Sequence, residues 1–183
     1  MSHYEVTSLN IKKTAFIGIL AAIICVFAPF SFPVGAIPIS FSTFAIYIVS
    51  SSVDKKYSLP AVIIYILIGA VGLPVFSSFT GGLQCLTGYT GGYIIGYIPC
   101  AFIIGMLTDR FENNKVIYPL SMIAGTAVCY LSGILWYMHR AGCGFPEAFT
   151  VCVLPFIIGD IIKITAASCV GITLKKRIEK LIR

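Results

Sequence analysis

The amino-acid sequence predicts an all-α integral membrane protein with six transmembrane helices and both termini in the cytoplasm. Its residues are 58% hydrophobic and 11% charged, whereas a soluble domain carries about 25% charged residues. The apolar runs are continuous and do not alternate with a period of two, which argues against a transmembrane barrel. No stretch remains for a soluble domain, so we expect residues 1–183 to form one transmembrane domain.

The six apolar runs are separated by turn residues and charges. We expect helices at about 12–28, 39–53, 59–71, 90–108, 116–137 and 148–174.

Helix breakers and charges set these boundaries. Prolines and glycines at 29–38 form a loop after the first helix, and the charged turn 54–56 ends the second. The third helix ends at Gly72, and Pro99 is tolerated in the fourth because neighbouring membrane helices can satisfy the freed backbone groups. Pro155 is expected to kink the sixth segment or to start its deeply inserted part.

The distribution of basic residues agrees with six spans. Only Arg140 falls in an outer loop, and Lys163 falls within the membrane, as the positive-inside rule requires. The inner segments hold Lys12, Lys13, Lys55, Lys56, Arg110, Lys115, Lys175, Lys176, Arg177, Lys180 and Arg183. Topology therefore accounts for the net charge of +6, and we expect no nucleic-acid binding. The tail from Lys175 is expected to touch anionic lipid.

Asp160 and Lys163 place a carboxylate and an ammonium inside an otherwise apolar segment. Such groups cost roughly 2.5–3.5 kcal/mol each on insertion scales, and they usually mark a ligand site or a relay. Residues i and i+3 share a helix face, so the two side chains can form a pair that points into one polar pocket. The alternative is an ion pair that only holds the sixth helix in the bundle.

A glycine-rich, uncharged outer loop at 81–93 is the second candidate site. Glycine lets a backbone approach a ligand closely. The residues expected to contribute are Gly82, Gln84, Thr87, Tyr89, Thr90, Gly91, Gly92 and Tyr93. The aromatic residues Phe41, Tyr93, Trp136 and Tyr137 are candidate walls of the pocket. A flexible connector is the alternative for the loop, and simple packing is the alternative for the aromatics.

Small residues recur every fourth position in the first helix, at Thr14, Gly18 and Ala22. Such a stripe lets another helix approach closely, either within this bundle or in a partner. The seven cysteines form no C-x-x-C pair, so we expect no metal site. Cys85 and Cys143 fall in outer loops, and their redox state is left open.

Four sequence motifs together resemble the biotin-specific substrate-binding (S) component of energy-coupling factor (ECF) vitamin transporters. They are Ile37-Pro38-Ile39-Ser40-Phe41-Ser42-Thr43-Phe44, Gly72-Leu73-Pro74-Val75-Phe76, Gly81-Gly82 with Leu86-x-Gly88-x-Thr90-Gly91-Gly92-Tyr93-x-x-Gly96-Tyr97, and Pro155-Phe156-x-x-Gly159-Asp160-x-x-Lys163. The resemblance extends from Ile11 to about Leu174. Two positions depart from the family pattern: Tyr89 stands where proline is usual, and Ser42 stands where glutamine is frequent.

The resemblance implies an S-component fold and biotin uptake across the cytoplasmic membrane of a prokaryote. It implies no catalytic residues and no cofactor in this chain, with ATP hydrolysis on ATPase subunits that work with a transmembrane coupling protein. Thr14, Gly18 and Ala22 match the helix face that meets the coupling protein. We expect Asp160 to accept from a ureido N–H, Lys163 to donate to the ureido carbonyl, and the loop N–H groups or Arg140 to meet the biotin carboxylate.

Three other functions remain open from the sequence. An S component for thiamine or riboflavin would share the fold, an intramembrane enzyme would use Asp160 as an acid or base, and a structural subunit would bind no vitamin alone.

Overall fold

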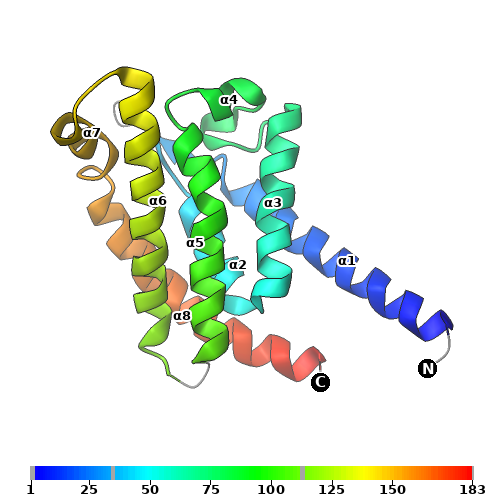
Figure 1. The fold of residues 1–183 in the computed structure, drawn as a ribbon. Coiled ribbons are helices and arrows are strands. Elements are labelled where there is room, and N and C mark those ends of the chain that lie inside the picture. The colour runs from blue at the N-terminus through cyan, green and yellow to red at the C-terminus, as the bar shows by residue number, and fades with distance from the viewer. Residues whose placement is uncertain (1–2, 34–35, 112–113, 183) are drawn as a thin grey trace.

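The computed structural model describes residues 3–33, 36–111 and 114–182, with side chains described between residues 11 and 178. Figure 1 shows the long helices of this part packed side by side, with α1 extending away from the others toward its N-terminal end. These helices are α1 (His3–Phe27), α2 (Ser42–Ser52), α3 (Lys55–Val71), α5 (Gly91–Arg110), α6 (Ile117–Ala141) and α8 (Ile157–Ile182). The shorter elements are β1 (Ser31–Phe32), β2 (Ile39–Ser40), the 3₁₀ turn η1 (Ser77–Phe79), α4 (Leu83–Thr87) and α7 (Phe145–Cys152).

Three helices in the described residues are long and apolar enough to cross a membrane. They are α5, α6 and the part of α8 from Ile157 to Ile178. Helices α2 and α3 have 11 and 17 residues, which is shorter than the ~20 residues of a straight crossing. The chain is therefore a helical membrane protein, and a count of six spans stays a prediction.

The second helix begins later than the sequence predicts. Ile39 and Ser40 form β2, which pairs antiparallel with β1 so that Phe32 lies opposite Ile39. Helix α2 starts only at Ser42 and is buried on most of its surface, where it contacts α1, α3, α5 and α8. The loop predicted at 29–38 therefore contains a short strand, which places the start of α2 at the centre of the bundle.

Helix α3 begins a turn earlier than predicted, at Lys55 instead of Leu59. The reason is a tertiary contact: the carboxylate of Asp109, at the end of α5, accepts the backbone N–H of Lys55 at 2.9 Å. One of the unsatisfied amides at the start of α3 thus receives a partner from a distant part of the sequence.

The sixth predicted helix is divided in two. Helix α7 ends at Cys152 and α8 begins at Ile157, and the turn between them contains Pro155. Proline lacks the N–H that a continuous helix requires, which explains the break. As a result, Asp160 lies in the first turn of α8.

The first described residue of α1 and the last of α8 lie at the same end of the bundle, where α2 also turns into α3 (Figure 1). This arrangement agrees with termini on one side, but their orientation in the membrane stays a prediction. Arg183 and the side chain of Lys180 lie outside the described part of the chain. The thiols of Cys85 and Cys143 are half-buried and free.

The basic C-terminal segment does not behave as one lipid-facing tail. Lys175 is buried, with 2% of its surface exposed, whereas Lys176 and Arg177 are exposed. The prediction that the tail from Lys175 lies on anionic lipid is therefore wrong for Lys175 itself. Its ammonium is paired with Asp109 inside the bundle.

Glycines allow α5 and α6 to lie in close contact. A Cβ atom at Gly92 would come within 2.3 Å of the Trp136 Cβ and 2.6 Å of the Ser132 carbonyl oxygen. At Gly18 on α1, a Cβ atom would meet nothing within 4 Å. The same substitution at these two glycines should therefore have different effects.

We expect Gly92→Ala to destabilise the protein by about 1–3 kcal/mol, because overpacking forces the two helices apart. Gly18→Ala is the matched control and should not lower stability, because its methyl group enters open space and alanine favours a helix more than glycine does. Thermal unfolding of both purified variants in the same detergent measures the difference. Equal stability of the two variants would contradict the close α5–α6 contact.

Candidate ligand-binding site

A cavity of about 230 Å³ lies between β2, α2, α3, α5, α6 and α8, under the segment that contains η1. Its lining residues are Ile37, Pro38, Ser40, Thr43, Tyr65, Phe76, Ser77, Ser78, Thr80, Thr90, Tyr93, Ile94, Tyr97, Thr126, Cys129, Tyr130, Phe156, Asp160 and Lys163. Of these described residues, only Asp160 and Lys163 are charged. An apolar and aromatic cavity with a few convergent polar groups is typical of a small-molecule site.

Asp160 and Lys163 form the ion pair that their spacing predicts. Nζ of Lys163 lies 3.1 Å from Oδ1 of Asp160, and their side chains are 11% and 6% exposed respectively. The pair is almost removed from solvent, so the surrounding hydrogen bonds must offset the free-energy cost of desolvating the two charges.

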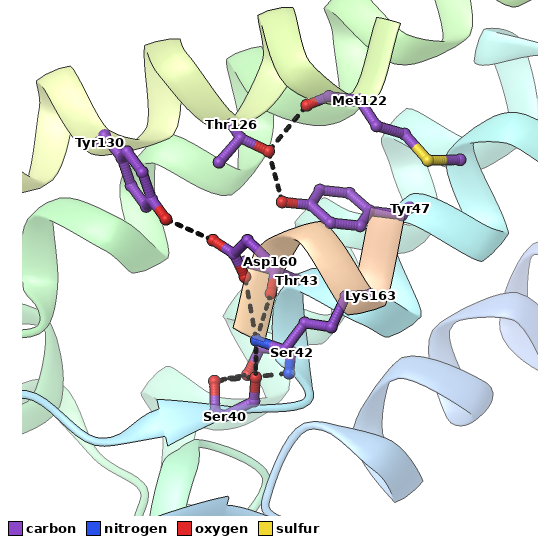
Figure 2. Close-up of polar contacts among 9 residues, drawn as sticks. All are labelled: Ser40, Ser42, Thr43, Tyr47, Met122, Thr126, Tyr130, Asp160 and Lys163. Atoms are coloured by element: carbon purple, nitrogen blue, oxygen red, sulfur yellow. Dashed lines mark hydrogen bonds and ion pairs between the residues drawn. The ribbon is translucent and has the colours of Figure 1, made fainter. Parts of the chain in front are cut away.

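The Lys163 ammonium uses all three of its N–H donors. Besides Asp160, it donates to the Ser40 carbonyl oxygen at 2.8 Å and to Oγ1 of Thr43 at 3.2 Å (Figure 2). Ser40 ends β2 and Thr43 lies in the first turn of α2. The late start of α2 thus leaves a carbonyl group available beside α8.

The second carboxylate oxygen of Asp160 faces α6. Oδ2 accepts from the Tyr130 hydroxyl at 2.5 Å (Figure 2), a distance typical of a strong O–H···O⁻ bond. A carboxylate has about four lone-pair positions, and these contacts occupy two. Asp160 can therefore accept a further hydrogen bond, whereas Lys163 must give up a present acceptor before it can donate to a ligand.

A second polar contact ties α2 to α6 beside the ion pair. The Tyr47 hydroxyl bonds to Oγ1 of Thr126, which donates to the Met122 carbonyl oxygen at 2.7 Å (Figure 2). Tyr47 is fully buried. This contact fixes the helix α6 that presents both Thr126 and Tyr130 to the cavity.

Hydroxyl groups gather at the exposed mouth of the cavity. Ser77, Ser78 and Thr80 line it from the segment around η1. Ser78 adopts a left-handed conformation with a φ of 60°, which is uncommon outside glycine. Its N–H donates to the Pro29 carbonyl oxygen at 2.9 Å, and its Oγ lies 2.9 Å from that of Ser31. These bonds tie the two loops together at the mouth.

The structure brings four of the predicted binding residues to the cavity: Asp160, Lys163, Thr90 and Tyr93. Gln84 and Thr87 lie on α4, are exposed and bond to backbone carbonyl groups of their own segment. Gly82 donates its N–H to the Gly69 carbonyl oxygen at 2.7 Å and joins the loop to α3. Ligand contact by Gly82, Gln84 and Thr87 stays a prediction.

Gly91 and Gly92 serve close packing in this structure. A Cβ atom at Gly91 would lie 1.8 Å from the Leu86 carbonyl oxygen, and both glycines face Trp136. Trp136 donates from Nε1 to the Gly88 carbonyl oxygen at 2.9 Å, which holds the loop against α6. Gly91, Gly92 and Trp136 are not among the residues that line the cavity. Ligand contact by Gly91 and Gly92 stays a prediction.

Phe41 and Tyr137 also lie outside the lining. Phe41 contacts Phe44 edge to face, with 6.1 Å between ring centroids. Tyr137 contacts Tyr89, the residue at the position where the family usually has proline, at 5.4 Å. Both residues therefore pack against other aromatic side chains, and direct contact of Phe41 with a ligand stays a prediction.

Sequence reasoning missed Tyr130, Ser40, Thr43 and the hydroxyls near η1. A signal existed for Tyr130, because Thr126 and Tyr130 are four residues apart and face the same side of an apolar helix. The contribution of the Ser40 carbonyl group had no sequence signal, because it depends on where α2 begins.

The small-residue stripe of α1 faces away from the bundle. Thr14, Gly18 and Ala22 are exposed, whereas Leu20 and Ile24 on the other face are buried. Within the described residues, the stripe is therefore not buried against the rest of the bundle. Among the described residues, no group of three or more His, Cys, Asp or Glu side chains could hold a metal ion.

Comparison with known proteins places these features in one family. The model of the BioY family matches residues 2–180. The chain belongs to the BioY family.

Relatives in the BioY family are named as biotin transporters. The chain is 38% identical to the "Biotin transporter BioY" of Thermotoga maritima over 87% of this chain and 93% of that protein. It is 33% identical to the "Probable biotin transporter BioY" of Pyrococcus horikoshii over the same shares. The fold matches a crystal structure of the S-component for biotin from an ECF-type ABC transporter, with a TM-score of 0.83, 22% identity and coverage of 96% of this chain and 95% of that chain.

We expect Lys163→Met to destabilise the unliganded protein by about 3–5 kcal/mol, because it leaves the Asp160 carboxylate buried without its cation. The double variant Asp160→Asn/Lys163→Met should lose less stability than the sum of the losses in Asp160→Asn and Lys163→Met, because neither charge remains in it. Chemical or thermal unfolding in detergent measures all three.

Lys56→Met is the matched control for this measurement. Lys56 pairs with Asp54 at 2.7 Å, but its side chain is 64% exposed, so its loss should cost at most about 1 kcal/mol. Equal costs for Lys56→Met and Lys163→Met would contradict a buried pair that requires both partners.

Proposed function

We propose that this chain binds biotin as the S component of an ECF-type transporter and supports biotin uptake across the cytoplasmic membrane of a prokaryote. One observation carries the proposal. This chain of the BioY family has a cavity in which Asp160 and Lys163 are the only charged residues among the described lining residues. The names of the relatives and the fold match support the same ligand class.

The hydrogen-bonding capacity of the pair suits the ureido ring of biotin, which has two N–H donors and one carbonyl group. Asp160 accepts a ureido N–H through a lone pair left unused by Lys163 and Tyr130. Lys163 donates to the ureido carbonyl by exchanging its longest acceptor contact, the one to Thr43 at 3.2 Å. Tyr93 and Phe156 then lie beside the bicyclic ring, since both line the cavity.

The valeryl chain extends toward the mouth in this arrangement. The carboxylate meets hydroxyls of Ser77, Ser78 or Thr80, which are the polar groups of the exposed end of the cavity. Arg140, the earlier candidate partner for this carboxylate, is exposed at the end of α6 and is not a lining residue.

Biotin binding by purified protein tests the proposal. A hydrogen bond to a charged partner contributes about 1.5–3 kcal/mol, so Asp160→Asn and Lys163→Ala should each weaken binding roughly tenfold to hundredfold. The matched controls Asp54→Asn and Lys56→Ala change the same residue types in an exposed ion pair outside the cavity, and they should bind as the wild type does. Titration calorimetry with folded, monodisperse variants gives the affinities.

The ligand itself is tested by mass spectrometry of what the protein retains after gentle purification, followed by competition with thiamine and riboflavin. Retained biotin that neither vitamin displaces supports the proposal. Displacement by thiamine or riboflavin would assign another vitamin, and undiminished affinity in both cavity variants would remove the ion pair from the site.

Transport requires partners in this proposal. The sequence contains no G-x-x-x-x-G-K-[ST] motif, so ATP hydrolysis belongs to separate ATPase subunits, and a transmembrane coupling protein joins them to this chain. The exposed stripe Thr14, Gly18 and Ala22 is the proposed docking face. Six spans with cytoplasmic termini would place the cavity mouth on the outer side.

A bulky residue in this stripe should block docking without affecting the cavity. We expect Gly18→Trp to abolish co-purification of the coupling protein and to reduce biotin uptake by cells, while biotin affinity of the isolated chain stays unchanged. Leu131→Trp is the matched control, because Leu131 is an exposed apolar residue on α6 with 53% of its surface accessible. Retained co-purification by Gly18→Trp would rule out this face.

A further inference from the structure

A second buried ion pair lies at the end of the bundle opposite the cavity mouth. Nζ of Lys175 on α8 is 3.0 Å from Oδ1 of Asp109 at the end of α5, and it donates to the Thr108 carbonyl oxygen at 3.2 Å. The two side chains are 3% and 21% exposed respectively. Oδ2 of Asp109 accepts the N–H of Lys55, the first residue of α3, at 2.9 Å. One carboxylate therefore joins α3, α5 and α8.

Helix α8 is less buried in the bundle than the other two candidate spans are. Of the three candidate spans, its apolar window is the least buried, at 28% against 61% for α5 and 44% for α6. The turn at 153–156 separates it from α7. Hydrogen bonds have narrow distance limits, so small sliding movements of a helix break them. The polar contacts at its two ends therefore fix α8 along its axis.

Both lysines of these contacts belong to the same rigid helix. Lys163 and Lys175 are twelve residues apart, which corresponds to about 18 Å along the axis. A shift of α8 that separated Lys175 from Asp109 would also move Asp160 relative to Tyr130 on α6. Their 2.5 Å hydrogen bond would not survive a displacement of one ångström.

We propose that Lys175 and Asp109 are positioning residues for the ligand site. Their ion pair holds α8 at the depth at which Asp160 and Lys163 meet the ligand, and ligand binding in turn favours the closed pair. Coupling between two sites is reciprocal, so a contact that favours binding must itself be favoured by the ligand. The inference rests on the proposed binding of biotin and adds a second site that responds to it.

Protection of Lys175 from an amine-acylating reagent tests this coupling. Purified wild-type protein, first shown by calorimetry to bind biotin, is labelled with and without saturating biotin, and peptide mass spectrometry measures the rate at each lysine. We expect biotin to slow acylation of Lys175 about fivefold or more, the lower end of typical coupling between sites. The exposed neighbour Lys176 should be unaffected.

A thiol control separates positioning from general stabilisation. Cys100 is fully buried on α5 and is neither a cavity-lining residue nor part of the ion pair, so its alkylation reports opening of the whole bundle. The proposal is supported if biotin slows the acylation of Lys175 and leaves the rate of alkylation of Cys100 unchanged. Equal protection of both, or no protection of Lys175, would overturn it. Failure of the wild type to bind biotin would reject the proposed function and this inference with it.

Variants test the same coupling from the other direction. Lys175→Met and the neutral double variant Asp109→Asn/Lys175→Met should both release bound biotin about fivefold faster than the wild type. Lys176→Met is the matched control and should release it at the wild-type rate. The double variant leaves no unpaired buried charge, so it remains informative if the single variant does not fold. Wild-type release by the folded double variant would overturn the proposal.

Discussion

The pairing of Asp160 with Lys163 is the interaction on which the rest of the structure depends. Both groups lie on α8, a helix whose other side exposes Ile158, Ile161 and Ile162. A charged side chain inside a membrane-spanning helix carries an insertion cost of roughly 2.5–3.5 kcal/mol. The attraction between the two charges offsets this cost only when their remaining hydrogen-bond donors and acceptors are satisfied. Strand β2 and helix α2 supply the acceptors for the ammonium, and helix α6 supplies the donor for the carboxylate.

This requirement explains irregular backbone in the middle of a helical protein. A carbonyl group inside a helix is already bonded to the amide four residues later, so a buried ammonium needs a carbonyl group at an element end. Ser40 ends β2, two residues before the first residue of α2, and provides it. The break at Pro155 likewise positions the ion pair, because it lets α8 begin three residues before Asp160. Non-helical backbone is tolerated in membrane proteins where it is buried in protein or lines a cavity, and both breaks satisfy that condition.

The sequence alone predicted the helical membrane class, most helix positions to within about a turn, and the ion pair itself. Asp160 and Lys163 were predictable because two ionisable residues in an apolar run are rare and their spacing is local. Two of the errors share a cause, which is contact between distant segments. The early start of α3 depends on Asp109, and the burial of Lys175 depends on the same carboxylate. No periodicity within one segment encodes such pairs.

The hydrogen bonds that Asp160 and Lys163 make within the protein bear on how a carrier of this kind would release its cargo. Lys163 has three acceptors within the protein, so a bound biotin would replace contacts instead of creating all of them anew. The free energy of binding is then the difference between ligand contacts and the internal contacts that they displace. A site that keeps its own charges paired does not leave an unsatisfied ammonium behind when the ligand departs, so release avoids the desolvation penalty of an unpaired buried charge. In the proposed complex, Asp160 would gain a hydrogen bond through its remaining lone pairs, whereas the bond from Lys163 to the ligand would replace a contact that Lys163 already makes.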